Sequence, residues 1–557
     1  MIFFGVRLIL GLELNINPHC TNSPYPLFGK RGKNCKTTMS KLEQIYEQLD
    51  TVFKDTQTLT VVGGNWGDEG KGKVIDLVMR KFDVAIRFSG GANAGHTVFT
   101  DADPVNNLPS KKIVSHLIPC GLAQNKICVM ARGEFFNAEL FLKELEETRQ
   151  SLGTKEISAI YIDQQAPLWT PYHTALEAYI ELMRGEKKIG TTNKGIGPLE
   201  GLYKLRLSPV VGHLLAPKAL NIVLTSLYNV LKPCFDFVHP VRDRSSLDDR
   251  SKDSQAVSNG AKSQNLMTNE IPTPETVLAN LLSYSEQIKP FVADTSFLLS
   301  KMYTQGKKLL FEGAQATGLD AFWGTYPFVS SGNSVSQGAS IGTGMPMNIF
   351  DTVVVVCKTL PTRVGMGPFP SEMWGRQEAM DFAKDNKDLF TDKKKRAEFL
   401  AGLLEKINAG ISTNAEMSQY FQVLGDERGA TTGRGRSLGF LDIPWLAYAV
   451  RINGPKYLAL TRFDMLSGIK KVPVVVGYKL DGEIMETGQV PPPWRISEIE
   501  PVIEIWQGFQ ENIYGISNFA DLPTNAQNFI HKIESLVGVP IMFIGTGPER
   551  DAIIVKT

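Results

Sequence analysis

The chain contains Leu59-Thr-Val-Val62, followed directly by Gly63-Gly-Asn-Trp-Gly-Asp-Glu-Gly-Lys-Gly-Lys73 and then by Val74-Ile-Asp-Leu-Val-Met79. The first segment is typical of a short strand and the last of a helix. A strand, a glycine-rich loop and a helix N-terminus in this order form a cradle for phosphate, because glycines let several backbone N–H groups point inward. The sequence therefore predicts an anion-binding loop.

This loop departs from the usual phosphate-binding motif at one position. Gly67 to Lys73 satisfies the spacing G-x-x-x-x-G-K, but Val74 stands where Ser or Thr usually holds Mg²⁺. A bound metal–nucleotide would need another oxygen ligand, and Asp68 is the candidate because a carboxylate suits a hard cation. The alternative is an ordinary glycine turn, and the five glycines and two lysines from residue 63 to residue 73 argue against it.

A second glycine cluster, Gly90-Gly-Ala-Asn-Ala-Gly-His-Thr97, follows soon after the first. His96 is the one histidine in a glycine-rich segment, whereas the others, such as His116 and His173, are typical of structural positions. A histidine in such a loop suits acid–base chemistry near neutral pH. The alternative is a structural histidine, which is the commoner case for a single histidine.

Apolar runs alternate with longer helical patterns along the rest of the chain. Helices are predicted at Ala138–Leu152 and Pro171–Arg184, and Thr352–Cys357 is apolar throughout, as in a strand buried on both faces. Strands separated by helices favour an α/β fold with a mostly parallel sheet. The predicted strands are Leu59–Val62, Lys111–Leu117, Ile127–Met130, Ile157–Ile162, Lys308–Phe311, Thr352–Cys357, Tyr457–Leu460, Val472–Tyr478 and Ile541–Ile544.

Composition excludes several classes of protein. The 557 residues carry 59 Lys and Arg against 58 Asp and Glu, and this net charge of +1 disfavours a general nucleic-acid-binding protein. With 43% hydrophobic and 21% charged residues, the chain can bury a large core. No apolar run is long enough to span a bilayer. Length alone suggests about three or four domains.

The six cysteines are scattered, with no C-x-x-C pair, so neither a zinc site nor a disulfide framework is indicated. We therefore expect reduced thiols and a cytoplasmic protein.

Two segments are expected to lie outside the folded core. Residues 1–55 are interpreted as a poorly ordered and dispensable N-terminal extension, although Met39 opens a helical pattern and could be the true start. An organelle-targeting segment within residues 1–40 is the alternative. A polar stretch at about 241–270 has few large apolar residues, which predicts a surface insertion.

Nine motifs in order resemble the signatures of the adenylosuccinate synthetase family. The resemblance begins with Gly64–Lys73 and Gly90–Thr97 and covers about residues 58–557. So many motifs in the same order make a chance match negligible. The further motifs are Gly190–Pro198, Phe311–Gln315, Gly324–Ser331, Thr362–Pro370, Gly429–Arg436, Thr461–Asp464 and Gly545–Pro548.

The resemblance implies one catalytic domain over residues 56–557. Its fold would be α/β and P-loop-NTPase-like, with a large, mostly parallel central sheet flanked by helices and with elaborated loops and subdomains. The implied activity is that of a ligase in AMP biosynthesis, which joins L-aspartate to IMP with GTP as co-substrate and Mg²⁺ as cofactor. In the family, O6 of IMP is first phosphorylated by GTP, and the aspartate amine then displaces phosphate from the 6-phosphoryl-IMP intermediate.

The same resemblance implies roles for individual residues. Asp68 would remove the proton on N1 of IMP and also touch Mg²⁺. His96 would stabilise and protonate the oxygen bridging to the leaving group, and Lys71 would spread the charge of the transferring phosphoryl group. The backbone carbonyl of Gly95 would bind Mg²⁺. Asp464 would accept hydrogen bonds from guanine, which would explain a preference for GTP.

Positions that match the family's binding motifs fall into three groups. The GTP-binding positions are Gly67, Asp68, Glu69, Gly70, Lys71, Gly72, Lys73, Gly95, His96, Thr97, Arg436, Arg462, Phe463, Asp464, Gly545, Thr546 and Gly547. The IMP-binding positions are Asp68, Asn93, Ala94, Gly95, His96, Thr192, Arg206, Gln315, Ser330 and Arg434. The aspartate-binding positions are Ala430, Thr431, Thr432, Gly433, Arg434, Gly435 and Arg436.

Arg206 matches an arginine that reaches the IMP phosphate of the neighbouring subunit, so the resemblance also implies a homodimer with shared sites. No nucleic acid and no membrane are expected as partners. At the guanine site, Arg462 replaces a usual Lys and Gly545 a usual Ser. These two replacements weaken the prediction of strict selectivity for GTP but leave the prediction of the reaction unchanged. Ser437 stands where a further arginine is usual.

Two rival interpretations remain open on the sequence. A phage-type relative that acts on dGMP lacks the catalytic aspartate, and the presence of Asp68 argues against it. An inactive nucleotide-binding scaffold would be indicated by the loss of Asp68, Lys71 or His96, and all three are present.

Overall fold

The computed structural model describes residues 40–99, 112–153, 157–185, 188–245, 271–363, 365–428 and 435–557. Residues Lys41–Thr557 form one compact unit. The three or four domains suggested by chain length alone are therefore wrong. Residues 1–39 of the expected extension and residues 246–270 of the expected insertion lie outside the described residues.

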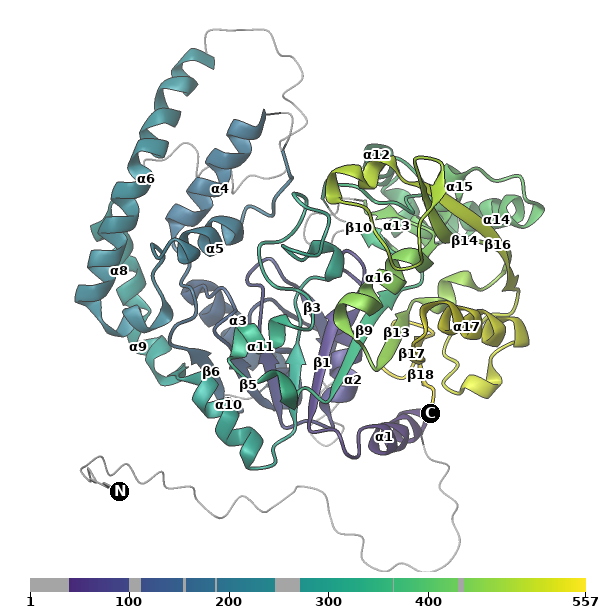
Figure 1. Cartoon of the computed structure of the whole chain (residues 1–557), viewed down its shortest axis with the longest axis horizontal. Helices are drawn as coiled ribbons and strands as arrows, with labels where there is room; N and C mark the ends of the chain where they lie inside the picture. Colours follow the sequence, from purple (N-terminus) through teal and green to yellow (C-terminus); the bar gives the residue numbers. More distant parts are fainter. Residues whose placement is uncertain are drawn as a thin grey trace, which may run out of the picture. The chain divides into compact units, whose positions relative to one another are not determined.

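A ten-stranded sheet forms the centre of the described part of the chain (Figure 1). The strand order is β18-β17-β13-β9-β1-β8-β2-β5-β6-β7, and only the pairing of β17 with β18 is antiparallel. β1 (Thr58–Gly63) lies between β8 (Leu309–Glu312) and β9 (Thr352–Lys358). The expected mostly parallel sheet is therefore confirmed. The other strands are β2 (Val84–Arg87), β5 (Ile127–Met130), β6 (Ile160–Asp163), β7 (Val292–Ala293), β13 (Tyr457–Thr461), β17 (Ile541–Gly545) and β18 (Ile553–Val555).

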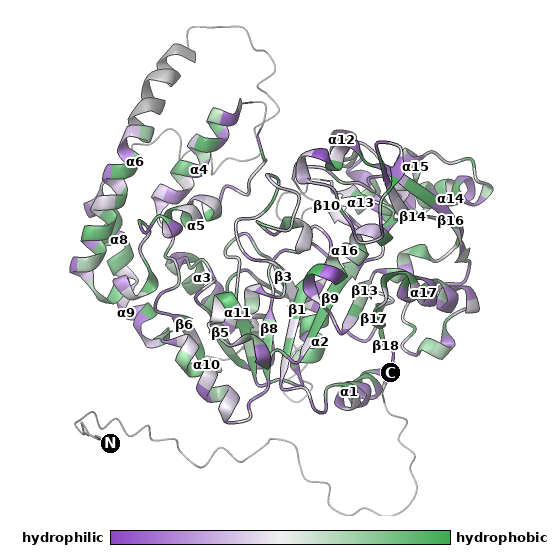
Figure 2. Cartoon of the chain, viewed as in Figure 1, coloured by the Kyte–Doolittle hydropathy of each residue, from purple (hydrophilic) through white to green (hydrophobic). Residues whose placement is uncertain are grey.

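The two faces of the sheet pack against separate layers of helices. In β1, Val61 belongs to one hydrophobic cluster and its neighbour Val62 to the other, because successive side chains of a strand point to opposite faces. Burial on both faces explains why β9 is apolar almost throughout, and Figure 2 shows these hydrophobic strands between amphipathic helices. Helices of the first layer are α1 (Lys41–Val52), α2 (Lys71–Met79) and α3 (Ala138–Leu152), and those of the second are α10 (Thr295–Thr304), α16 (Ile443–Asn453) and α17 (Thr524–Val537).

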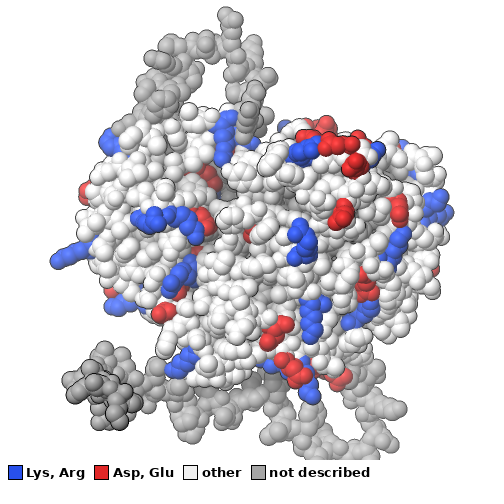
Figure 3. All heavy atoms as spheres, viewed as in Figure 1, with Lys and Arg blue, Asp and Glu red and all other residues white. Residues whose placement is uncertain are grey.

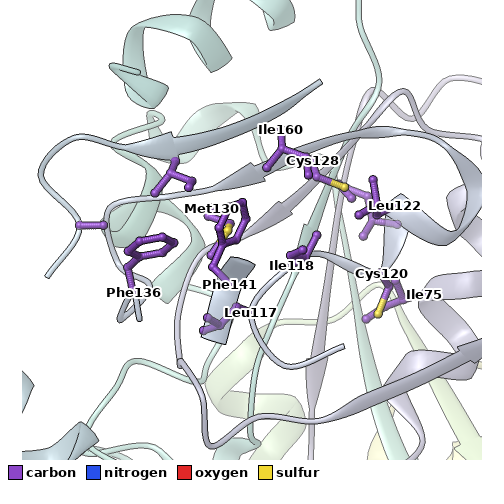
Figure 4. Close-up of a cluster of buried hydrophobic side chains, with 14 of the residues drawn as sticks. Ile75, Leu117, Ile118, Cys120, Leu122, Cys128, Met130, Phe136, Phe141 and Ile160 are labelled. Atoms are coloured by element: carbon purple, nitrogen blue, oxygen red, sulfur yellow. The ribbon is translucent and has the colours of Figure 1, made fainter. Parts of the chain in front are cut away.

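The first layer also buries two cysteines. Figure 4 shows Cys120 and Cys128 among aliphatic and aromatic side chains, including Phe136 and Phe141. Both thiols are free.

Further elements flank the central sheet on its two sides (Figure 1). One group contains the helices α4 (Pro171–Arg184), α5 (Ile196–Lys204), α6 (Pro217–Ser245) and α8 (Pro274–Ser283). The other contains a smaller sheet in which β14 (Ile469–Leu480) pairs antiparallel with β16 (Glu500–Phe509). The surface carries both signs of charge side by side, and Figure 3 shows no large area of one sign on the visible face.

Most predicted elements are confirmed, but several strands differ from the prediction, and β16 is among those that were not predicted. The helices expected at Ala138–Leu152 and Pro171–Arg184 have those bounds. The strands expected at Lys111–Leu117 and Val472–Tyr478 lie outside the central sheet, in antiparallel pairs formed by β4 (Lys112–Ser115) with β3 (His96–Phe99) and by β14 with β16. The sequence also missed β2, since a run of four residues after a helix gives little periodic signal.

The boundary of the N-terminal extension needs correction. Residues 41–55 were expected to belong to the extension, but the compact unit begins at Lys41 and includes α1. Ile45, Leu49 and Phe53 are buried in the first hydrophobic layer, because their spacing places them on one face of the helix and its end. Among the described helices, none is both long enough and apolar enough to cross a membrane.

The packing of α1 gives a test of this corrected boundary. Leu49→Ala is expected to lower the free energy of unfolding by about 2–5 kcal/mol, because it removes a fully buried side chain and leaves a cavity. Glu47→Ala, on the exposed face of the same helix, should change it by less than about 0.5 kcal/mol. Urea denaturation of both variants checks this, and equal midpoints would contradict a structural role for α1.

Candidate active site

The predicted site residues follow the carboxyl ends of parallel strands. The glycine-rich loop leaves β1, and its neighbours β8 and β9 run in the same direction. Since the carboxyl ends of parallel strands meet at one edge of a sheet, segments far apart in sequence converge there. These segments are the loop after β1, Gly313–Gln315 after β8, the end of β9 at Lys358, Arg462–Asp464 after β13 and Thr546–Gly547 after β17.

The glycine-rich loop turns sharply into α2. Gly67 and Gly70 have φ angles of +91° and +83°, which glycine adopts readily, and Asp68 between them has a φ of 58°. A Cβ added at Gly72 would lie 2.8 Å from the carbonyl oxygen of Thr97, so glycine there lets α2 pack directly on β3. The loop that carries Asp68 is thereby fixed against the strand that begins with His96.

Hydrogen bonds to neighbouring strand ends hold the loop in place. The Asn65 side chain accepts from the backbone N–H of Lys358 (2.9 Å), and the Thr461 hydroxyl donates to the carbonyl of Glu69 (2.6 Å). Inside the loop, the buried Glu69 carboxylate accepts from the backbone N–H of Gly67 (2.8 Å) and lies 2.7 Å from Lys71 Nζ. Glu69 therefore fixes the conformation of the turn and the position of Lys71, the lysine expected to bind phosphate.

Asp68 faces a network of buried charges. Its Oδ2 lies 2.8 Å from Arg436 Nε, and Arg436 Nη1 lies 3.0 Å from the fully buried Glu427. Glu427 is also 2.7 Å from Lys358 Nζ and 3.6 Å from Arg462 Nη1. Burial alone would raise the pKa of Glu427, but the three cations lower it to about 2. Glu427 is therefore ionised and joins three positive side chains beside Asp68.

His96 is held by a second buried carboxylate. Its Nδ1 lies 2.6 Å from Glu312 Oε1, which is 3.3 Å from Arg87 Nη2 and accepts from the Cys120 thiol at 3.2 Å. Burial, followed by the charge of Arg87, lowers the pKa of His96 to about 4 despite the opposing effect of Glu312. The partner of Nδ1 assigns the proton of the neutral ring to that nitrogen and leaves Nε2 as an acceptor.

Metal-type donors also meet at this histidine. His96, Cys120 and Glu312 place donor atoms within 4.8 Å of one another. The guanidinium of Arg87 beside Glu312 opposes a cation at that point. The oxygen ligands expected for Mg²⁺, at Asp68 and Gly95, lie in loops with partly or fully exposed residues.

Three predicted ligand-binding side chains have a buried oxygen atom without a hydrogen-bond partner among the described residues. These atoms are Asn93 Oδ1, Gln315 Oε1 and Asp464 Oδ1. Buried polar atoms are rarely left unpaired in proteins, so each is a candidate contact for a ligand. Burial raises the pKa of Asp464, with Arg462 acting against the rise.

Other predicted GTP-binding residues hold the base-side segments together. Lys73 Nζ donates to the carbonyls of Gly547 (2.6 Å) and Ala552 (2.8 Å), and burial lowers its pKa to about 8. Thr546 is buried, and its hydroxyl donates to the Ile516 carbonyl at 2.8 Å. Phe463 is buried in the second hydrophobic layer, so only its backbone is available to a ligand.

The predicted IMP-binding residues are less tightly placed. The Ala94 carbonyl accepts from His116 Nδ1 at 2.6 Å, which gives His116 a role in shaping the second glycine loop. Thr192 and Arg206 are exposed, and Ser330 is half-buried. Thr97 and Gly95 are exposed as well.

The predicted aspartate-binding segment is only partly described. Ala430, Thr431, Thr432, Gly433 and Arg434 lie outside the described residues. Gly435 is buried and forms a β-bridge with Arg428, and Arg436 follows it into the charge network. Ser437, at the position of a usual arginine, is buried and donates to the Glu372 carboxylate.

Sequence reasoning missed Glu312, Glu427 and Lys358. Glu312 stood inside a quoted motif next to Gln315, and Glu427 lies just before the aspartate-loop motif. An acidic residue adjacent to a predicted binding loop is the signal that could have found Glu312 and Glu427. Their burial and their cationic partners, however, depend on the tertiary structure.

The fold and this charge arrangement define an α/β nucleotide-binding enzyme, built around a glycine-rich loop between a central strand and a helix. The family model described as adenylosuccinate synthetase matches residues 60–554, and the chain belongs to the adenylosuccinate synthetase family. Members of this family are ligases that form a C–N bond, so the chain is an enzyme of that class.

Individual relatives agree with this assignment. The adenylosuccinate synthetase of Thermodesulfovibrio yellowstonii is 36% identical over 503 residues, covering 90% of this chain and 99% of the relative. That of a Thermoanaerobacter species is 34% identical over 499 residues, covering 89% and 99%. The solved structure of fully ligated adenylosuccinate synthetase from Plasmodium falciparum matches with a TM-score of 0.69 and 29% identity, covering 90% of this chain and 100% of that chain.

The burial of His96 predicts a pH dependence. Its pKa of about 4 in the folded protein lies below the ordinary value of 6.5, so folding favours the neutral ring. This contribution to stability is complete above pH 6.5 and is lost as the pH falls toward 4. Histidine-selective NMR titration without nucleotide should show a neutral His96 at pH 6, with the His96→Asn variant assigning the signal. An imidazolium at that pH would contradict the described environment.

Proposed function

We propose that the protein joins L-aspartate to IMP at the expense of GTP and releases adenylosuccinate, GDP and phosphate. The observation that carries the proposal is the packing of the glycine-rich loop, with Asp68 and Lys71, against the strand that begins with His96. Gly72 allows this close contact with Thr97. This packing supports roles for Asp68 as the base, for Lys71 as the phosphate-binding lysine and for His96, which Glu312 holds, at one edge of the sheet.

The residues suit the two steps of this reaction. Asp68 would accept the N1 proton of IMP, so that O6 attacks the γ-phosphorus of GTP and the bond to the bridging oxygen breaks. Lys71 and the backbone N–H groups at the start of α2 would stabilise charge on the transferring group. The amine of aspartate would then attack C6, and the C6–O6 bond would break with release of phosphate.

His96 would meet the bridging oxygen of the leaving GDP. Its neutral ring must gain a proton to donate there, and the negative phosphates of GTP would raise its pKa on binding. Glu312 would hold the Nδ1–H and stabilise the imidazolium that results. Glu312 thus orients the ring, and protonation of the ring would depend on the bound phosphates.

The residues present fit Mg²⁺. Asp68 is 41% exposed and offers a carboxylate oxygen, and the exposed Gly95 offers a backbone carbonyl, which are ligands of the hard type that this cation prefers. When bound, Mg²⁺ would neutralise charge on the phosphates of GTP. Asp68 would have to balance this role against its ion pair with Arg436.

We also propose a homodimer and a cytoplasmic location. Arg206 is exposed, has a φ of 66° and makes no side-chain ion pair within the described chain, which leaves it available to a neighbouring subunit's IMP phosphate. The free thiols of Cys120, Cys128 and Cys357 are compatible with a reducing compartment.

Removal of the proposed base tests the reaction. Asp68→Ala is expected to lower kcat for adenylosuccinate formation by about 10²–10⁴-fold, because N1 of IMP then has no acceptor for its proton. The assay follows adenylosuccinate by absorbance with IMP, GTP and aspartate. Asp50→Ala, an exposed carboxylate of α1, is the control and should leave kcat unchanged. Full activity of Asp68→Ala, or faster turnover of dGMP than of IMP, would refute the proposal.

A second test concerns the choice of GTP over ATP. Asp464 can accept from N1–H and the 2-amino group of guanine, and adenine offers no such pair of donors. Asp464→Asn is expected to raise KM for GTP by about 10²-fold and to leave KM for IMP unchanged, because a buried site loses a charged hydrogen-bond acceptor. Steady-state kinetics with GTP and ATP measure this. An unchanged preference for GTP would remove Asp464 from base recognition.

The two unusual residues at the guanine site form a matched pair. A Cβ added at Gly545 would lie 3.2 Å from the backbone nitrogen of Arg462, so the space beside this arginine is tight. Because Lys and Ser are the usual residues of the family at these two positions, Gly545→Ser should be tolerated better in combination with Arg462→Lys than alone. The ratio of kcat/KM for GTP to that for ATP in the single and double variants checks this, and additive effects would contradict the coupling.

A further inference from the structure

Glu427 is the centre of the charge network beside the nucleotide loop. It is fully buried and touches cations from three separate segments, namely Lys358 at the end of β9, Arg462 after β13 and Arg436 before β11 (Ser437–Leu438). None of these partners is close to another in sequence. The carboxylate therefore ties three segments together at the edge of the sheet where the loops meet.

The network leaves an excess of positive charge. Lys358, Arg436 and Arg462 contribute three positive charges, against two negative charges from Glu427 and Asp68, so the group has a net charge of +1. Such an excess at a recessed position attracts anions such as nucleotide phosphates. Without Glu427 the same cations would repel one another at distances set by the fold.

Arg436 and Arg462 connect Glu427 to the two ends of the GTP site. Arg436 contacts both Glu427 Oε2 and Asp68 Oδ2, so it is shared between a fully buried carboxylate and the proposed base. Arg462 immediately precedes the base-side segment that contains Asp464, has a φ of 59°, and donates from Nη1 to the Gly425 carbonyl at 2.9 Å. The Glu427 carboxylate thus restrains Arg436 at one end of the proposed GTP site and Arg462 at the other.

We propose that Glu427 is a positioning residue that holds Arg436 and Arg462 in place and so couples recognition of the guanine base to the position of Asp68. The inference rests on the proposed function for the identity of the nucleotide. By competing for Arg436, Glu427 keeps that arginine from pairing with Asp68 alone, so that Asp68 can accept a proton in the chemical step. By fixing Arg462, it sets the entry to the segment that recognises the base.

The test compares Glu427→Gln with Glu427→Asp. Glutamine keeps the shape and removes the charge, so KM for GTP should rise and kcat should fall, each by about tenfold to hundredfold, while KM for IMP changes less than about twofold. Glu427→Asp keeps the charge and should partly restore both KM for GTP and kcat. Asp163→Asn is the matched control, since Asp163 is another buried carboxylate that pairs with an arginine, Arg132 at 3.2 Å, at the end of β6. It should leave both constants within about twofold of the parent.

A titration with a fluorescent GDP analogue separates this inference from the proposed function. Glu427→Gln should bind the analogue about tenfold more weakly than the parent, whether or not the parent turns over IMP. Failure of the parent to form adenylosuccinate would refute the proposed function alone. Nucleotide affinity and KM within twofold of the parent in Glu427→Gln, or equal changes in all Michaelis constants, would refute the positioning role.

The coupling itself is tested by a double-variant cycle. If Glu427 acts through Arg462, the combination of Glu427→Gln with Arg462→Ala should raise KM for GTP less than the product of the single effects. The combination of Glu427→Gln with Asp163→Asn should be multiplicative. A multiplicative result for both combinations would show that Glu427 and Arg462 act independently and would overturn the coupling.

Discussion

The parallel pairing of β1 with both β8 and β9 is the constraint on which the site depends. It brings the glycine-rich loop, Gln315 and Lys358 to one edge of the sheet, although β1 ends at Gly63 and its two neighbours begin only at Leu309 and Thr352. Hydrogen bonds from Lys358 to Asn65 and from Thr461 to Glu69 then fix the loop to the adjacent strand ends. The rest of the site is arranged around that fixed loop.

Buried carboxylates supply the second level of organisation. Glu69 holds Lys71, Glu312 holds His96 and Glu427 holds Arg436, so each of these three side chains rests against an anion that is itself almost fully buried. A buried anion is costly unless it is paired, and the pairing fixes the geometry of both partners. Left-handed backbone at Asp68, Gln315 and Arg462 adds local strain at the same positions, as is common where structure serves function.

The sequence predicted the features that are local along the chain. The loop from Gly63 to Lys73 and the helix Pro171–Arg184 could be recognised because their signals lie within a few residues. Glu312 and Glu427 could not, since Glu312 pairs with His96 across 216 positions and only the order of the strands brings them together. The helical pattern that opens at Met39 could be recognised from the sequence, but the burial of Ile45 and Leu49 of α1 in the main compact unit depends on the tertiary structure.

Transfer of the oxygen at C6 of IMP to the released phosphate is the most direct measurement of the central claim. The protein would be incubated with GTP, aspartate and IMP that carries oxygen-18 at C6, and the phosphate would be analysed by mass spectrometry. The label is expected to appear in phosphate in a one-to-one ratio with adenylosuccinate, because O6 is phosphorylated before the amine attacks. Adenylosuccinate formed with unlabelled phosphate, or phosphate released without adenylosuccinate, would contradict it.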